Sequence, residues 1–233
     1  MKGVDRGSSW RGTLKVAGLE ALLTIEGAAA IDGVLPAFSH LTERHNGIDE
    51  PCASEAALPI NIAVDETITD RATSLPRGPV FSATGAGLVH HEPPAVNWYE
   101  RDRWIELRAP ATTFSNGRLR AQPANGALSI WLADHGALWM HVGAVVVDGR
   151  AAVLVGSAGA GKSTTSVACA LAGAGFVGDD FCAVDVHRPS GPTIHSVYGT
   201  AKLLPDADRH LGQPGATTLG WTAEGKRVVA MTE

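Results

Sequence analysis

Residues 151–181, AAVLVGSAGAGKSTTSVACALAGAGFVGDDF, decide the expected fold of this 233-residue chain. A nearly all-apolar run comes first and predicts a buried strand. A glycine-rich loop follows, and then an alanine-rich run without proline, which predicts a helix that ends near Gly173 or Gly175. FVGDD then predicts a buried strand that ends in charge. Strand, loop, helix and strand in this order predict an α/β core.

The glycine-rich loop, GSAGAGKS at residues 156–163, matches the pattern G-x-x-x-x-G-K-[S/T] in full. Its glycines let successive backbone N–H groups turn inward as a nest for an anion, and the helix N-terminus adds its positive end. The lysine can reach β- and γ-phosphate oxygens, and the serine hydroxyl can ligate Mg²⁺. A chance match would rarely fall between such a strand and such a helix. We therefore predict that a nucleotide is bound by Gly156, Ser157, Ala158, Gly159, Ala160, Gly161, Lys162, Ser163 and Thr164.

Two carboxylates, Asp179 and Asp180, close the FVGDD strand. An acidic residue at the end of a strand beside a phosphate loop can hold Mg²⁺ directly or through water. Two neighbouring negative charges also raise the pKa of one of them, which moves it toward a useful general base. The alternative interpretation is a turn with two solvated aspartates.

The stretch before the loop, HVGAVVVDGRAAVLVG at residues 141–156, predicts a hairpin. Two apolar runs flank Asp148-Gly149, a dipeptide suited to the positive φ angles of a tight turn. The second run is expected to be covered on both faces. His141 begins the first strand; it is a candidate site residue, with a purely structural role as the alternative.

Taken together, residues 141–181 resemble the catalytic core of the HPr serine kinase/phosphorylase family and of the wider set of HPr-kinase-like proteins. That family places a histidine before a hairpin, then its phosphate loop, then a paired-aspartate strand end. Here His141 precedes Lys162 by 21 positions, and Lys162 precedes Asp179 by 17. The resemblance implies the following roles: nucleotide phosphates held by Gly156, Gly159, Gly161 and Lys162, metal bound by Ser163 with help from Asp179, the acceptor proton taken by Asp180, and the charge of the aspartates tuned by His141.

The resemblance further implies an ATP- and Mg²⁺-dependent kinase that phosphorylates a hydroxyl on a protein, peptide or small molecule. Relatives assemble, so it is compatible with a homo-oligomer. The sequence departs from the bifunctional enzymes at Ala158 and Thr164, where they favour serine and glutamate, and it lacks their downstream arginine- and glycine-rich signature. These departures argue against phosphorylase activity and against HPr itself as the acceptor.

Two other functions stay open. One is a P-loop ATPase or GTPase that drives a conformational switch, although the chain has neither an Asn-Lys-x-Asp guanine signature nor an ABC-type signature. The other is a nucleotide-binding module that has lost its chemistry, an interpretation favoured by the short stretch after Asp180.

Composition excludes several other classes. A net charge of −5 with no basic face argues against a nucleic-acid partner. No apolar run is long enough to cross a bilayer, and the first residues lack the apolar core of a secretory signal. The thiols Cys52, Cys169 and Cys182 have no metal-site spacing. We therefore expect a cytoplasmic protein with no membrane partner.

For the whole chain we expect an α/β fold in two parts: a smaller β-rich region at residues 1–125, and a P-loop kinase core of the HPr-kinase/PEP-carboxykinase-like type with a mixed central sheet at 126–233. Strands are predicted at 14–25, 60–66, 79–85, 96–100, 103–109, 181–187, 194–199 and 226–231, helices from Asn125 to Gly136 and at 205–211, and a loop at 42–59. His90 and His91 are placed in a polar loop. Lys202 is interpreted as a solvated or structural lysine, with contact to a phosphate or an acidic acceptor as the alternative.

Overall fold

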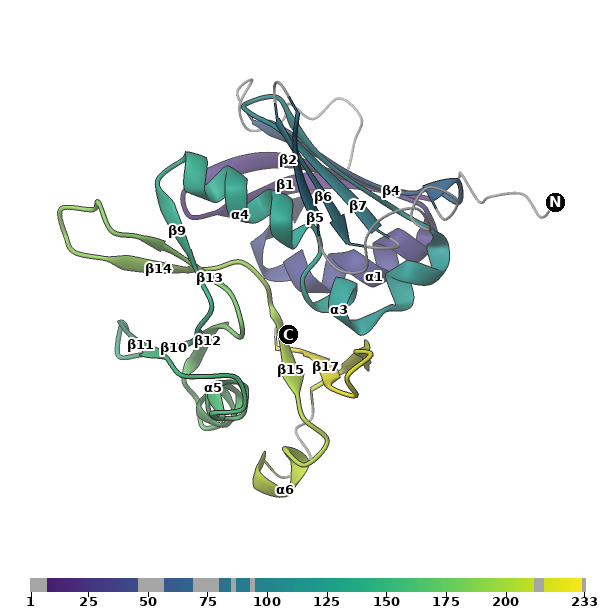
Figure 1. Cartoon of the computed structure of the whole chain (residues 1–233). Coiled ribbons are helices and arrows are strands. Elements are labelled where there is room, and N and C mark those ends of the chain that lie inside the picture. The colour runs from purple at the N-terminus through teal and green to yellow at the C-terminus, as the bar shows by residue number, and fades with distance from the viewer. Residues whose placement is uncertain are drawn as a thin grey trace.

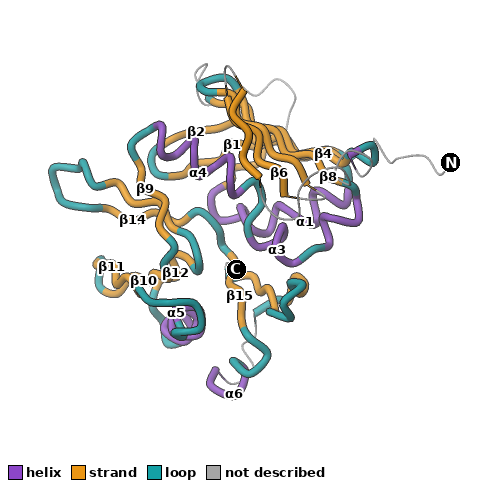
Figure 2. The backbone as a smooth tube through the Cα atoms, viewed as in Figure 1, coloured by secondary structure: helices purple, strands orange, loops and turns teal. Residues whose placement is uncertain are grey.

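The computed structural model describes residues 8–45, 57–68, 80–84, 87–92, 95–211 and 216–231 (Figures 1 and 2). Cys52 lies outside these residues. In the parts of the chain that are described, no helix has the length and apolar character needed to span a bilayer.

The helices are α1 (Ala28–Phe38), α3 (Gly117–Ala121), α4 (Asn125–Asp134), α5 (Lys162–Leu171) and α6 (Asp208–Leu211), with 3-10 turns η1 (Ser39–Leu41) and η2 (Ala111–Ser115). The first strands are β1 (Ser9–Val16), β2 (Leu19–Glu26), β3 (Thr42–Arg44), β4 (Leu58–Val64), β5 (Val80–Thr84), β6 (Gly87–Glu92), β7 (Ala95–Glu100) and β8 (Trp104–Ala109). The later strands are β9 (Ala137–Met140), β10 (Gly143–Val147), β11 (Arg150–Leu154), β12 (Gly175–Gly178), β13 (Cys182–Asp185), β14 (Thr193–Ser196), β15 (Thr200–Leu203), β16 (Thr218–Trp221) and β17 (Arg227–Ala230).

The largest unit is an eight-stranded sheet with the order β3-β1-β2-β4-β8-β7-β6-β5. β4 is parallel to both β2 and β8, whereas the other neighbours are antiparallel, so the sheet is mixed. The prediction of an α/β fold with a mixed sheet is confirmed. The mixed sheet was expected within residues 126–233, and this expectation is wrong. The N-terminal region, which we expected to be the smaller part, forms the sheet. The rest of the chain forms three three-stranded sheets instead.

The first hairpin corrects another expectation. The predicted single strand at 14–25 is interrupted by Ala17 and Gly18, whose φ angles of 53° and 81° form a two-residue turn between β1 and β2. Helix α1 follows β2 and had no sequence prediction. His90 and His91 lie in strand β6 rather than in a loop. The predicted loop at 42–59 contains β3 and the start of β4, and its middle residues lie outside the described ones.

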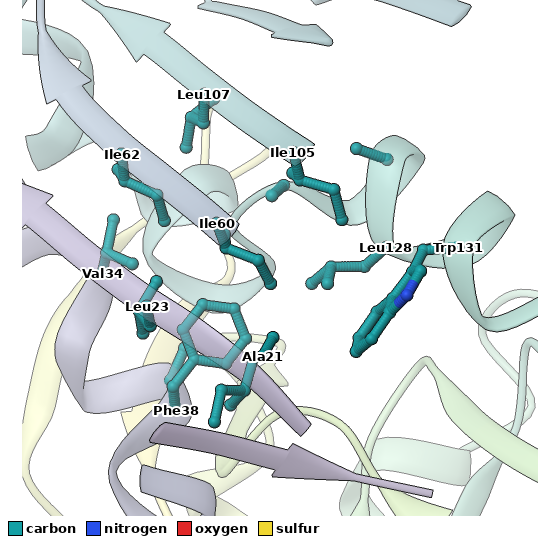
Figure 3. Close-up of a cluster of buried hydrophobic side chains, with 14 of the residues drawn as sticks. Ala21, Leu23, Val34, Phe38, Ile60, Ile62, Ile105, Leu107, Leu128 and Trp131 are labelled. Atoms are coloured by element: carbon teal, nitrogen blue, oxygen red, sulfur yellow. The ribbon is translucent and has the colours of Figure 1, made fainter. Parts of the chain in front are cut away.

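One face of the large sheet forms the main core (Figure 3). Leu23 of β2 pairs with Ile60 of β4, which pairs with Ile105 of β8, so these apolar side chains share a face. Helices α1 and α4 cover that face, with a buried aromatic side chain from each, Phe38 and Trp131. Burial of a helical stripe against alternating strand residues explains why these helices form here.

The second part of the chain carries the smaller sheets, with the orders β11-β10-β12, β14-β13-β9 and β15-β17-β16. The tight hairpin predicted at Asp148-Gly149 is confirmed, with φ angles of 49° and 73° between β10 and β11. The expectation that β11 is covered on both faces is wrong. β11 is an edge strand, and α5 packs mainly on β10 and β12, which leaves Val153 43% exposed.

Helix α4 begins at Asn125 as predicted, and the residue that precedes it, Ala124, has a left-handed conformation. Gly136, with a φ of 84°, ends this segment as expected. The predicted end of α5 is also confirmed, since the helix stops at Leu171 and Gly173 has a φ of 98°.

Short polar contacts join the two parts of the chain. The Tyr198 hydroxyl donates to the Pro123 carbonyl at 3.0 Å, and the Thr200 hydroxyl donates to the Ala121 carbonyl at 2.7 Å. Tyr198 also packs in the main core together with α4. Side chains on both sides of the predicted 125/126 boundary therefore share one core, and the boundary itself stays a prediction.

Candidate functional site

The phosphate-loop sequence lies between β11 and the first residue of α5, as the strand–loop–helix pattern predicts. The backbone is left-handed at Gly159 and Gly161, with φ angles of 82° and 87°, a conformation that glycine adopts without strain. Residues 155–160 are all exposed. A ligand in solution therefore has direct access to the loop and to the positive end of α5.

The loop lysine, Lys162, lies against its own loop. Its ammonium donates to the carbonyl oxygens of Gly156 at 2.9 Å and Ser157 at 3.1 Å. The structure thus places Lys162 with the predicted phosphate-binding residues rather than in contact with Asp179 or Asp180. Carbonyl oxygens are weaker partners for an ammonium than phosphate oxygens, so an anion in the loop would compete for this side chain.

The paired aspartates follow the end of β12 in a tight turn. The backbone N–H of Phe181 donates to the Asp179 carbonyl at 2.9 Å, and Asp180 between them has a φ of 69°. Left-handed backbone at a residue other than glycine is uncommon and costs on the order of 1 kcal/mol or more. This turn ends the strand, so the two neighbouring carboxylates contact different partners.

Asp179 is a buried carboxylate, only 3% exposed, so the interpretation of a solvated turn is wrong for it. Its Oδ2 accepts a hydrogen bond from the backbone N–H of Lys202 at 2.9 Å, while its Oδ1 is buried with no hydrogen-bond partner among the described residues. Burial, and then the charge of Asp180, raise the pKa of Asp179 to about 6. The Lys202 amide and then the Ser163 hydroxyl act in the opposite direction and lower this pKa.

Asp180 accepts contacts from three side chains. The Lys202 ammonium lies 2.5 Å from its Oδ2, the Gln122 amide donates to the same oxygen at 3.2 Å, and His141 Nε2 lies 3.3 Å from its Oδ1. Burial alone would raise the pKa of Asp180, but the Lys202 ammonium and then His141 outweigh it and hold that pKa below its ordinary range. Asp180 is therefore ionised at neutral pH.

His141 lies in the connection between β9 and β10 rather than within a strand, and its side chain is 55% exposed. Its ring packs on Phe181 with 5.3 Å between ring centroids, and Phe181 in turn stacks on Trp139. These aromatic contacts orient the imidazole beside Asp180 while leaving it open to solvent.

Two residues of the site were not among the predicted site residues, although contact of Lys202 with a phosphate or an acidic acceptor was the alternative interpretation. Lys202 was interpreted as solvated or structural; its side chain is only 14% exposed and it contacts the acidic pair, so the solvated interpretation is wrong. Gln122 follows α3 and lies 58 positions before its partner Asp180. No spacing or motif marks it in the sequence, because the contact depends on how the two parts of the chain dock.

The buried, unpartnered Oδ1 of Asp179 and the Ser163 hydroxyl are hard oxygen donors, which fit Mg²⁺. Among the described residues no group of three or more His, Cys, Asp or Glu side chains is placed to hold a metal ion. Mg²⁺ bound with nucleotide needs no such group, because one or two protein oxygens act together with phosphate oxygens and water.

Comparison with known proteins gives no relative: no family model matches the chain, and neither a curated protein nor a solved structure does. Only the residues of the site therefore indicate what the protein does.

Proposed function

We propose that the protein is a Mg²⁺- and ATP-dependent kinase of the HPr-kinase-like type, which transfers the γ-phosphoryl group to a hydroxyl of a protein, peptide or small molecule. One observation carries the proposal. A single turn after β12 holds two carboxylates: Asp179, whose pKa the hydroxyl of the loop serine Ser163 lowers, and Asp180, which contacts His141. A carboxylate suited to a metal and a carboxylate suited to a hydroxyl therefore lie side by side at the end of the phosphate loop.

In this proposal the loop residues and Lys162 hold the β- and γ-phosphates of ATP. Lys162 exchanges its present contacts with the Gly156 and Ser157 carbonyls for phosphate oxygens. Ser163 and Asp179 hold Mg²⁺, which supplies positive charge against the phosphate oxygens. Burial of Asp179 gives this ion a strong effect, since the surroundings screen its charge less than water does.

Asp180 accepts a hydrogen bond from the acceptor hydroxyl. This contact directs the hydroxyl oxygen of the acceptor toward the γ-phosphorus. As the new O–P bond forms, the bond between the γ-phosphorus and the β,γ-bridging oxygen breaks, the hydroxyl proton passes to Asp180, and ADP leaves. A carboxylate held ionised by Lys202 and His141 suits this role, because positioning and charge stabilisation dominate catalysis of phosphoryl transfer.

The test is transfer of label from [γ-³²P]ATP to serine-containing proteins and peptides and to small alcohols, in the presence of Mg²⁺. We expect a labelled acceptor. Asp180→Asn should lower the transfer rate by roughly 100-fold or more, with nucleotide affinity changed by less than about threefold. The matched control is Asp206→Asn at an exposed aspartate, which should transfer at the wild-type rate. Hydrolysis of ATP to free phosphate, with no acceptor labelled, would contradict the proposal.

Hydrolysis is the second candidate, because the exposure of residues 155–160 gives water access to the loop. It fits a nucleotide-driven conformational switch. In that case Asp180→Asn should leave the rate of phosphate release unchanged. A binding module without chemistry would instead show a melting temperature raised by Mg·ATP and no turnover.

A further inference from the structure

Lys202 of β15 keeps Asp180 ionised in the roles above, but those roles give it no contact with the nucleotide or the acceptor. Its backbone N–H contacts Asp179 and its ammonium contacts Asp180, so this single residue joins both carboxylates. The side chain is only 14% exposed. A largely buried ammonium has to be paired, and its position is therefore tightly constrained.

Gln122 fixes the ammonium from a second direction. Its side-chain oxygen accepts a hydrogen bond from Lys202 at 3.1 Å, while its amide nitrogen donates to Asp180 at 3.2 Å. The three side chains form a closed triangle. An ammonium has three N–H donors, and these contacts use two of them. In the described part of the chain the third has no protein acceptor, so it is available to a ligand.

The position of Lys202 indicates which ligand group it would meet. A transferred phosphoryl group has to lie between the acceptor hydroxyl at Asp180 and the metal held by Ser163 and Asp179. Lys202 contacts both aspartates and therefore lies beside that position. Lys162, by contrast, lies along the loop. Two cations on different sides of the terminal phosphoryl group would distribute its developing negative charge.

We propose that Lys202, held in place by Gln122, binds the γ-phosphoryl group and makes the site selective for a nucleoside triphosphate over a diphosphate. This inference rests on the proposed function, because it takes the triphosphate as the substrate. Lys202 is then a second phosphate-binding cation that acts on the group to be transferred, and Gln122 is its positioning residue.

The experiment measures the Kd of the Mg²⁺ complexes of the non-hydrolysable ATP analogue AMP-PNP and of ADP by titration calorimetry. Lys202→Met should weaken AMP-PNP binding about 10- to 100-fold, the range for a hydrogen bond to a charged group, and change ADP binding less than about threefold. Lys202→Arg should retain most of the selectivity, and Gln122→Leu should lose part of it. Lys162→Met should weaken both nucleotides, whereas the control Lys226→Met should change neither.

An equal loss of both nucleotides in Lys202→Met, or no loss, overturns the inference, provided that its circular dichroism spectrum and melting curve show a folded protein. If Lys202→Met does not fold, the comparison of Lys202→Arg with Gln122→Leu decides in the same way. If an acceptor is labelled but these variants keep the wild-type selectivity for AMP-PNP over ADP, the inference about Lys202 is overturned and the kinase proposal stands. Selective binding through Lys202 without any transfer overturns the kinase proposal alone. A wild-type protein that binds neither nucleotide overturns both.

Discussion

The two parts of the molecule differ in how they are held together. In the large sheet, Ile25, Ile62 and Leu107 are fully buried beneath helices. In the sheet that leads to the phosphate loop, Val153 of β11 is 43% exposed, and Val155, which follows β11, is 77% exposed. Apolar burial therefore stabilises the first part, whereas the second depends on smaller clusters and on polar contacts with the first. The difference teaches that a well-packed scaffold positions a site whose acidic residues are buried, while the strand that enters its phosphate loop, β11, stays open to solvent.

The largest expected effect on the free energy of unfolding comes from truncating a buried side chain of the large sheet. Leu107→Ala should lower the free energy of unfolding by about 2–5 kcal/mol, since it leaves a cavity among fully buried side chains. Val153→Ala on the exposed edge strand should change it by less than about 0.5 kcal/mol. Urea denaturation measures both. Equal losses of unfolding free energy in the two variants would contradict the difference in stabilisation between the two parts of the molecule.

The free energy of unfolding is expected to depend on pH through Asp179, because its carboxyl group is buried. The folded pKa of about 6 lies above the ordinary value of 3.8, so the folded state binds the proton more tightly than the unfolded state. Stability from this group therefore falls as pH rises from about 4 to about 6, and the full penalty is present above pH 6. Asp179→Asn should remove this penalty, on the order of 3 kcal/mol at pH 7.5.

The same Asp179→Asn variant should lose Mg²⁺-dependent nucleotide binding while it gains stability. The measurements are unfolding free energies at pH 4.5 and 7.5, and nucleotide affinity with and without Mg²⁺. Asp206→Asn, at an exposed position, serves as the control. A variant that is less stable than the wild type at pH 7.5 would show that the buried carboxylate is not a cost to the fold.

A smaller effect is expected at the junction of the two parts. Thr200→Val removes the buried hydrogen bond to the Ala121 carbonyl and should cost about 1–2 kcal/mol of unfolding free energy. Thr218→Val, at an exposed strand position, is the matched control and should be close to neutral. Thermal unfolding followed by circular dichroism compares them. No loss in Thr200→Val would mean that this hydrogen bond does not help to hold the parts together.

The smallest effect concerns a surface ion pair on the large sheet. The Lys15 ammonium lies 3.0 Å from Glu43, but both side chains are well exposed. Lys15→Met should leave the denaturation midpoint unchanged within error, at both low and high salt, because solvent screens such a pair. A clear destabilisation would show that surface charge, as well as burial, stabilises this part.

Local signals in the sequence predicted the region around the phosphate loop well. The glycines of the loop, the Asp148-Gly149 turn and the end of α5 depend on backbone conformations that a few adjacent residues determine. The contact between His141 and Asp180 is present. Phosphate, metal and acceptor binding by the predicted residues stays a prediction.

Features that depend on long-range docking were missed. An apolar run such as that of β11 has the same sequence pattern whether the strand is covered on both faces or lies at an open edge of a sheet. Gln122 is 80 positions from Lys202, and only the docking of residues 121–123 on β15 and the segment before it brings them together. The large sheet was misplaced because its two halves join through β4 and β8, which are neighbours in the sheet but not in the chain.

The left-handed backbone at Asp180 has a consequence for laboratory evolution. Glycine, or to a lesser degree asparagine, would occupy that turn at lower energetic cost. Either replacement would, however, leave the largely buried Lys202 ammonium without its carboxylate, which costs more than the turn strain, so screening a mutant library for heat resistance should retain aspartate at this codon, as screening for turnover should. At this position natural selection for activity and artificial selection for robustness would therefore favour the same residue, in spite of its backbone strain.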